Sequence, residues 1–329
     1  MSVKVLADGT IASLFSKVSG EKLSAPGNHI RGLLVKEDFE DKWISNIGIS
    51  KVCEIIKGAL FDKVTSKGYM EDIRYQMEIR LPHGSSTNIE FDLELEFSNH
   101  EIGDFWHDES KMCICWELEQ KKPEIIIDEP FGVVTCKPNR PIHAANYVAL
   151  FENDKGVVVR HNGTPKSWVT GNKVTNLIAW GGKRFTNRSG FLHEATPRID
   201  VRLDGVYHYN YSISIAEHKD IPRITSDINS RITPFWIYEQ KESTNILPFE
   251  NKLIEIESNN IIPTAVEEND GNFILRAYEV SGTSCIPVIS TAMNFIEKTD
   301  VAGKLLNEKE IRPYEIVELK YRLVDNKDY

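Results

Sequence analysis

Alternating apolar and polar residues dominate this chain. The clearest run lies between Asn88 and Phe97, where five apolar side chains alternate with four acidic ones. A period of two is typical of a strand with one buried and one exposed face. The acidic face should therefore meet solvent or a basic partner. Comparable runs predict strands at residues 72–81, 112–118, 147–151, 156–160, 206–215 and 252–258.

Turn-forming residues separate these runs. Clusters of Gly, Asn, Asp and Pro lie at residues 8–9, 82–84, 153–156, 162–163, 204–205 and 269–271. Helical periodicity is nearly absent. Many short strands at regular spacing indicate a sandwich or barrel rather than alternating βαβ units. The sequence therefore predicts an all-β protein.

The alternation lapses at residues 218–234, where Lys219-Asp220-Ile221-Pro222 and several polar residues interrupt it. This interruption is the best candidate for a domain boundary. We therefore expect a large antiparallel β-sandwich at residues 1–220 and a smaller C-terminal β-sandwich at residues 221–329.

Composition narrows the classes of partner. The formal net charge of −10 disfavours nucleic acid and anionic membrane surfaces, because both require a positive face. No apolar run approaches the ~20 residues that cross a bilayer, and no signal peptide opens the chain. The five cysteines are odd in number and widely spread, which favours free thiols over disulfides. We expect a cytoplasmic protein without a nucleic-acid or membrane partner.

Two strands near the end of the chain carry a distinctive sequence. Residues 271–282 read Gly-Asn-Phe-Ile-Leu-Arg-Ala-Tyr-Glu-Val-Ser-Gly, and residues 311–319 read Ile-Arg-Pro-Tyr-Glu-Ile-Val-Glu-Leu. With these two, seven segments in order resemble the C-terminal β-region of glycoside hydrolase family 38, the α-mannosidases. The other five lie at residues 8–23, 128–134, 146–151, 156–163 and 204–213. Residues 97–116 depart from the pattern, since the family usually has a tryptophan-bearing strand and a Phe-Pro pair there.

The resemblance implies a β-supersandwich of the galactose-mutarotase type, followed by a smaller β-sandwich. It implies that the intact enzyme hydrolyses α-mannosides with retention, in an N-terminal catalytic domain that holds zinc or another divalent metal. This chain is expected to lack that domain and to be inactive alone, with no catalytic residue, metal ligand or cofactor of its own. Its expected partners are the catalytic domain and, in the intact enzyme, the glycan; homo-oligomer formation stays open.

One loop is implied to contact substrate. Residues 181–190 are basic, bounded by glycines and expected between two strands. Some family members carry Asn-Arg-Gly here, and its arginine reaches the catalytic pocket. Asn187 and Arg188 match that pair, with Ser189 in place of the glycine. A guanidinium group presents a planar fork of donors that suits vicinal sugar hydroxyls. The alternative is a solvated hairpin tip.

The cysteine pair and the acidic row can be explained without a metal site or a catalytic site. Cys113 and Cys115 follow His100, His107 and Asp108 and have the softness that zinc prefers. Structural zinc sites favour wider cysteine spacing, however, and a spacing of two is that of a half-buried strand. The acidic row at residues 90–96 is better explained as a solvated face than as paired catalytic carboxylates.

Two further functions stay open. A stand-alone carbohydrate-binding module needs exposed aromatic side chains on one face, and Trp43 and Trp168 are the best candidates. A mutarotase-like enzyme needs a histidine acid and a carboxylate base that converge on a sugar ring. The histidines considered for that role are His100, His143, His193 and His208.

Overall fold

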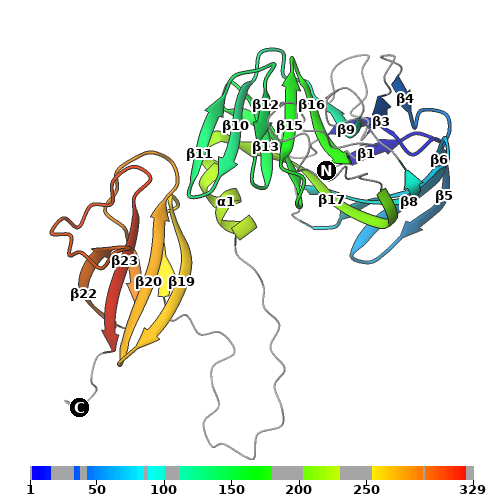
Figure 1. Ribbon diagram of the computed structural model, residues 1–329. Helices are drawn as coiled ribbons and strands as arrows, with labels where there is room; N and C mark the ends of the chain where they lie inside the picture. Colours follow the sequence, from blue (N-terminus) through cyan, green and yellow to red (C-terminus); the bar gives the residue numbers. More distant parts are fainter. Residues whose placement is uncertain are drawn as a thin grey trace, which may run out of the picture. The chain divides into compact units, whose positions relative to one another are not determined.

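A computed structural model describes residues 2–15, 33–37, 43–84, 88–100, 111–179, 203–229, 254–291 and 293–323 (Figure 1). Strands make up most of this part of the chain, and they pair in antiparallel fashion. The all-β class predicted from the alternation is confirmed. None of the described helical segments has the length and apolar character that a bilayer crossing requires.

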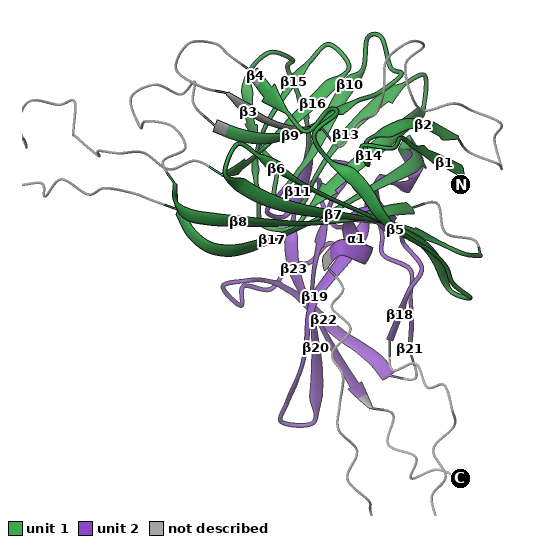
Figure 2. Ribbon diagram, turned by 90° about the vertical axis from the view of Figure 1, so that its right-hand side faces the viewer, with its two compact units in different colours: residues 1–128, 134–218 green, residues 129–133, 219–329 purple. Residues whose placement is uncertain are grey.

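The chain forms two compact units (Figure 2). Unit 1 comprises residues 1–128 and 134–218, and unit 2 comprises residues 129–133 and 219–329. The expected domains, 1–220 and 221–329, stay a prediction about which segments fold independently.

Unit 1 is built around two sheets. The larger has nine strands in the order β11-β10-β13-β14-β17-β8-β7-β6-β5. These strands are β5 (Lys51–Lys57), β6 (Phe61–Met70), β7 (Ile73–Pro82), β8 (Asn88–His100), β10 (Glu124–Glu129), β11 (Gly132–Cys136), β13 (Tyr147–Glu152), β14 (Lys155–His161) and β17 (Leu203–Glu217).

The smaller sheet has six strands in the order β12-β15-β16-β9-β3-β4. They are β3 (Leu33–Glu37), β4 (Trp43–Ser45), β9 (Lys111–Glu117), β12 (Pro141–His143), β15 (Lys166–Thr170) and β16 (Lys173–Ala179). A separate hairpin joins β1 (Ser2–Val5) to β2 (Ile11–Phe15).

The core of unit 1 lies between the two sheets. All five apolar side chains of the Asn88–Phe97 run are at most 1% exposed, as the alternation predicted. On the facing sheet, Trp116 of β9 packs edge-on against Phe91 with ring centroids 4.7 Å apart. Burying a side chain of this size contributes about 2–3 kcal/mol. The sandwich is therefore held by the apolar face of each sheet.

The acidic face of β8 meets a basic partner inside its own sheet. Arg74 of β7 pairs with Glu96 at 2.7 Å, and Arg80 of β7 contacts Asp92. Lys63 of β6 extends the row to Glu78 at 3.2 Å. Cross-strand ion pairs of this kind neutralise the neighbouring carboxylates, which would otherwise repel one another.

The N-terminal hairpin turns at Gly9, which has a φ of +80°. The carboxylate of Asp8 accepts hydrogen bonds from the main-chain nitrogen and the hydroxyl of Thr10, at 3.0 and 2.7 Å. A Cβ atom on Gly9 would overlap the side chain of Ser66 in β6. The turn therefore requires glycine twice, for its dihedral angle and for the close approach of β6.

We expect Gly9→Ala to lower the free energy of unfolding by about 2 kcal/mol, because positive φ and overpacking both oppose the new methyl group. Gly84→Ala is the matched control: its φ is +86°, but nothing lies within 4 Å of the added Cβ. Gly84→Ala should lower the free energy of unfolding by only about 1 kcal/mol, because only the positive φ opposes it. Urea unfolding measures both, and equal losses would contradict the role of Ser66.

Unit 2 contains two sheets and a helix. Strands β18 (Ile254–Ile256) and β21 (Ile289–Thr291) pair, and a four-stranded sheet has the order β19-β20-β23-β22. In Figure 1 the latter sheet runs from yellow to red. Its strands are β19 (Ile261–Asn269), β20 (Asn272–Glu279), β22 (Met293–Asp300) and β23 (Ile316–Leu323).

A helix occupies the expected boundary region. The 3₁₀ turn η1 (His218–Asp220) leads into α1 (Ile221–Asn229). Ile221, Ile224 and Thr225 are buried at helical spacing, and Pro222 stands in the first turn, where proline is tolerated. Nine residues are too few for the periodicity to stand out in the sequence.

The second closing strand differs from the expectation at its start. The sequence pattern predicted a strand from Ile311, whereas β23 begins at Ile316. Tyr314 has a φ of +58°, and the Glu315 nitrogen donates to the Arg312 carbonyl at 3.0 Å. Residues 312–315 therefore form a turn, which alternation alone does not distinguish from a strand.

Candidate functional site

Several residues considered from the sequence lie outside the described part of the chain. Asn187 and Arg188, the expected substrate-binding pair, are among them, as are His107, Asp108 and His193. The described residues contain two cavities in unit 1 and several reactive groups near them.

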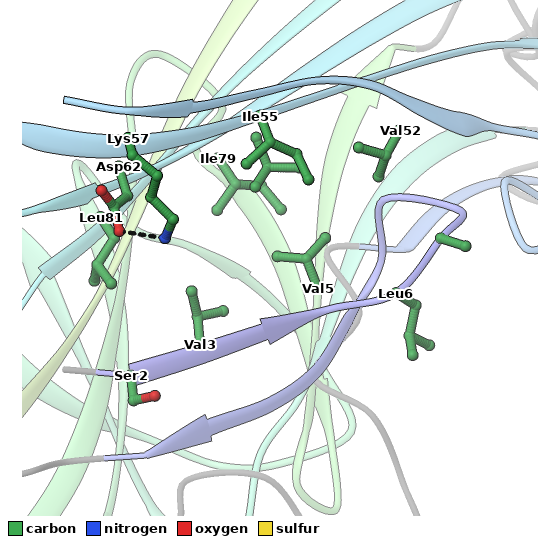
Figure 3. Close-up of a pocket in the computed structure, with 12 residues that line it drawn as sticks. Ser2, Val3, Val5, Leu6, Val52, Ile55, Lys57, Asp62, Ile79 and Leu81 are labelled. Atoms are coloured by element: carbon green, nitrogen blue, oxygen red, sulfur yellow. Dashed lines mark hydrogen bonds and ion pairs between the residues drawn. The ribbon is translucent and has the colours of Figure 1, made fainter.

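A cavity lies in unit 1, at the edge of the nine-stranded sheet. It has a volume of about 570 Å³. Figure 3 shows Val3 and Val5 of β1 pointing toward the strands that carry Ile55 and Ile79. One ion pair, Lys57 to Asp62 at 2.6 Å, closes its rim. We call it the edge cavity.

The ion pair at the rim is stable at neutral pH. The hydrogen bond from Lys57 lowers the pKa of Asp62, and His83 at 3.2 Å adds to the same effect. Asp62 is therefore a charged anchor for Lys57. The rest of the lining is almost entirely apolar, so the edge cavity has no group suited to acid–base chemistry.

Exposed apolar side chains lie on strand β5 and beside it at this edge. Strand β5 ends the sheet, and on its outer side the Val52 nitrogen donates to the Ala7 carbonyl at 3.0 Å. Exposed edge strands and apolar patches favour association with another surface. We define the edge patch as Ile47, Ile49, Ile55, Ile56, Leu60 and Phe61, which are between 38% and 78% exposed.

A second cavity in unit 1, of about 250 Å³, lies on the larger sheet and is lined mainly by polar residues. We call it the polar groove. Its lining comes from four neighbouring strands, β7, β8, β17 and β14, and the residue that follows β14. The lining residues are Arg80, Glu90, Phe91, Asp92, Arg160, His161, Asn162, Asn210, Tyr211 and Ser212.

The strand registers align the polar groups of this groove in two rows. Arg80, Glu90, Ser212 and Arg160 oppose one another across the four strands. In the next row on the same face Asp92 stands between Glu78 and Asn210, and it accepts a hydrogen bond from the Asn210 amide. Arg80 contacts both Asp92 and Glu78, the latter at 3.0 Å.

The described histidine candidates do not converge. The Nδ1 atom of His100 accepts a hydrogen bond from the Ser98 nitrogen, and its Nε2 atom lies 2.7 Å from Asp72. His208 is exposed and 4.0 Å from Glu94, and His143 is also exposed. None of the three lines a cavity described here.

Sequence reasoning missed His161. It lies at the end of β14, opposite Tyr211, and is 6% exposed. Burial lowers the pKa of His161 to about 4, so it is neutral at physiological pH. Its position continues the alternation at residues 156–160, which is the only sequence signal that could have placed it in the interior.

The cysteine pair behaves as buried apolar side chains. Cys113 and Cys115 lie on β9 and are 0% and 3% exposed. Burial raises the pKa of the Cys115 thiol, whose sulfur lies 3.7 Å from the Thr175 hydroxyl. Within the described residues no group of three or more His, Cys, Asp or Glu side chains could hold a metal ion.

Trp168, one of the two tryptophans considered for sugar stacking, is contacted by a cation, and the side chain of Trp43 lies outside the described part of the structure. Trp168 is half-buried, and the ammonium group of Lys166 lies 5.0 Å from its ring centroid. A cation over the ring occupies the face that a sugar would use. Trp116 is in the core.

The fold has counterparts among solved structures. An α-mannosidase from Enterococcus faecalis V583 matches 98% of this chain with a TM-score of 0.76 and 13% identity. A protein in glycosyl hydrolase family 38 from Enterococcus faecalis matches with the same coverage, score and identity. This chain covers 41% and 43% of those two chains, respectively.

No protein-family model matches the sequence, and no curated protein is significantly similar to it. At 13% identity the likeness concerns the fold. This chain therefore has an all-β fold that also occurs in α-mannosidases of glycoside hydrolase family 38, spanning less than half of their length. The resemblance stated from the sequence motifs is confirmed at that level.

Proposed function

We propose that this chain is the non-catalytic β-region of an α-mannosidase-like glycoside hydrolase. The observation that carries the proposal is the match of 98% of this chain to only 41% of an α-mannosidase. In the intact enzyme a separate catalytic domain hydrolyses α-mannosides with retention, and this β-region supports that domain in the cytoplasm. No described residues would hold the zinc or other divalent metal, which belongs to the catalytic domain.

The edge patch and the edge cavity support this function as a docking surface for the catalytic domain. Leu60 is 78% exposed and Ile55 is 65% exposed, which is costly unless another surface covers them. Ser2, Val3 and Val5 of the first strand line the edge cavity. A catalytic domain that precedes β1 in the same polypeptide would therefore join this unit beside the patch.

Asn187 and Arg188 are proposed to contact the glycan in the intact enzyme. The Arg188 guanidinium would reach the glycan from this β-region and donate to vicinal hydroxyls. The coding sequence upstream of Met1 tests the organisation: a reading frame that encodes paired His and Asp metal ligands is expected there.

The isolated chain is expected to show no hydrolysis of 4-nitrophenyl α-mannoside, with or without added zinc. The reason is that the metal and the catalytic residues are proposed to belong to the separate catalytic domain. Release of nitrophenolate is measured by absorbance. Clear turnover by the purified chain would contradict a non-catalytic role.

Ile55→Asp is expected to weaken the association with the catalytic domain at least tenfold, because it places a charge within the proposed interface. Ile286→Asp, at an isoleucine that is also 65% exposed but in unit 2, is the matched control. Sedimentation of the separately produced parts measures the association. If both variants weakened the association equally, the docking surface would not lie at the edge patch.

A further inference from the structure

The polar groove of unit 1 has the features of a ligand site that the proposed function does not use. It is formed within one sheet, by strands whose registers hold its polar groups in place. Neighbouring strands are about 4.8 Å apart, and alternate residues on one strand are about 7 Å apart. Its side chains therefore form a grid on the scale of one sugar ring.

The charges that line the groove cancel. Arg80 and Arg160 carry two positive charges, and Glu90 and Asp92 carry two negative ones. Arg80 is already engaged by Asp92 and Glu78. An anionic ligand would meet two carboxylates, and a cationic ligand would meet two guanidinium groups. The balance favours a neutral ligand that both donates and accepts hydrogen bonds.

Several groups of the lining have hydrogen-bonding capacity to spare. Glu90 interacts electrostatically with Arg80, its cross-strand neighbour, but forms no hydrogen bond with another described side chain. The side chains of Asn162 and Ser212 form no hydrogen bond with another described side chain either. Together they offer a carboxylate, an amide and a hydroxyl around one concave surface. Phe91 and Tyr211 belong to the core, so the floor between these groups is the sheet itself.

The volume limits the size of the ligand. At about 250 Å³ the polar groove lies just below the usual range of about 300–1,000 Å³ for sites of drug-sized ligands. It suits one ring rather than an extended chain. We infer that the polar groove binds a single neutral pyranose ring, with Glu90, Asn162 and Ser212 as its hydrogen-bonding contacts.

Titration of the chain with methyl α-D-mannopyranoside and methyl α-D-glucopyranoside, followed by amide chemical shifts, tests the inference. We expect saturable binding of at least one glycoside, with the largest shifts in β8 and β17. Glu90→Gln should weaken it about tenfold, because a charged acceptor for sugar hydroxyls is lost. Ser212→Ala, a smaller change that preserves the fold, should weaken it about threefold.

Glu94→Gln is the matched control, because Glu94 lies on the same face of β8 but outside the groove. It should leave binding unchanged. The inference is overturned if neither glycoside saturates, if Glu94→Gln weakens binding as much as Glu90→Gln, or if inorganic phosphate displaces the sugar. It does not depend on the proposed function: an active intact enzyme whose β-region binds no glycoside would overturn the inference alone.

Discussion

Glu279→Ala is expected to lower the stability of unit 2 by about 4 kcal/mol. The Glu279 side chain is fully buried and its carboxylate accepts hydrogen bonds from the nitrogens of Ser281, Gly282 and Tyr314, at 2.8, 2.8 and 3.1 Å. The Ser281 hydroxyl and the Asn260 amide also donate to it. Removing the acceptor leaves five part-buried donors unpaired at once, each at a cost of about 1–3 kcal/mol before water replaces the lost bonds.

The loss should be confined to the closing strands. Glu279 ends β20 and Tyr314 precedes β23, so the carboxylate joins the two turns. Gly282, with a φ of +72°, leaves room for the Tyr314 ring. Hydrogen exchange of amides in β20 and β23 measures the effect. Glu308→Gln, at an exposed residue of the same unit, is the control and should change exchange little. Comparable losses in the two variants would refute the assigned role.

The contribution of Glu279 should depend on pH. Burial raises its pKa, but the hydrogen bonds from Ser281, Tyr314 and Asn260 outweigh burial and lower the pKa overall. Its stabilisation is therefore complete above the unfolded value of about 4.3 and is lost as pH falls through the lower folded pKa. The gap in stability between wild type and Glu279→Gln should narrow in that window. A gap that stays constant to pH 2 would show that ionised Glu279 is not the acceptor.

Asn176→Ala is expected to destabilise unit 1 by about 3 kcal/mol. Asn176 lies on β16 in the smaller sheet and is 2% exposed. Its amide donates to the Thr164 carbonyl at 2.6 Å and to the Ser167 hydroxyl at 2.9 Å, and its oxygen accepts from the Tyr211 hydroxyl at 2.7 Å. Tyr211 belongs to the larger sheet, so this residue joins the two sheets by hydrogen bonds across the core. Alanine would remove these three bonds from an apolar interior and leave the Tyr211 hydroxyl only the Thr164 hydroxyl, at 3.3 Å.

A double-mutant cycle separates the network from simple packing. Tyr211→Phe removes only the hydroxyl and should cost about 1 kcal/mol, and the double variant should cost less than the sum of the two single variants. Thermal unfolding followed by tryptophan fluorescence measures all three. Strict additivity would mean that Asn176 and Tyr211 stabilise the core independently.

The β-sandwich could be predicted from the sequence because alternation along a strand indicates which of its side chains are buried. In β8 every apolar position of the Asn88–Phe97 run is in the core, since a shift by one residue would move the whole set to solvent. Short elements were harder to predict. The helix at Ile221–Asn229 and the turn before Ile316 depend on a few residues, and neither shows a sustained period.

The candidate sites also differ in whether the sequence could predict them. The expected pair, Asn187 and Arg188, came from a resemblance of motifs and stays a prediction. The polar groove did not emerge from the sequence, because Arg80, Glu90, Arg160 and Ser212 are spread over more than 130 residues. Only the sheet order β7-β8-β17-β14 places them in one row.

By itself the sequence determined the all-β class, the buried face of each long strand and the likeness to the α-mannosidase β-region. Those properties follow from neighbouring residues and from the order of motifs. The tertiary structure alone decided which polar groups meet. Glu279 and Tyr314 are 35 positions apart, and Asp92 and Asn210 are 118 apart. Strand pairing over such separations depends on the whole sheet, because each register is set by the packing of every strand beside it.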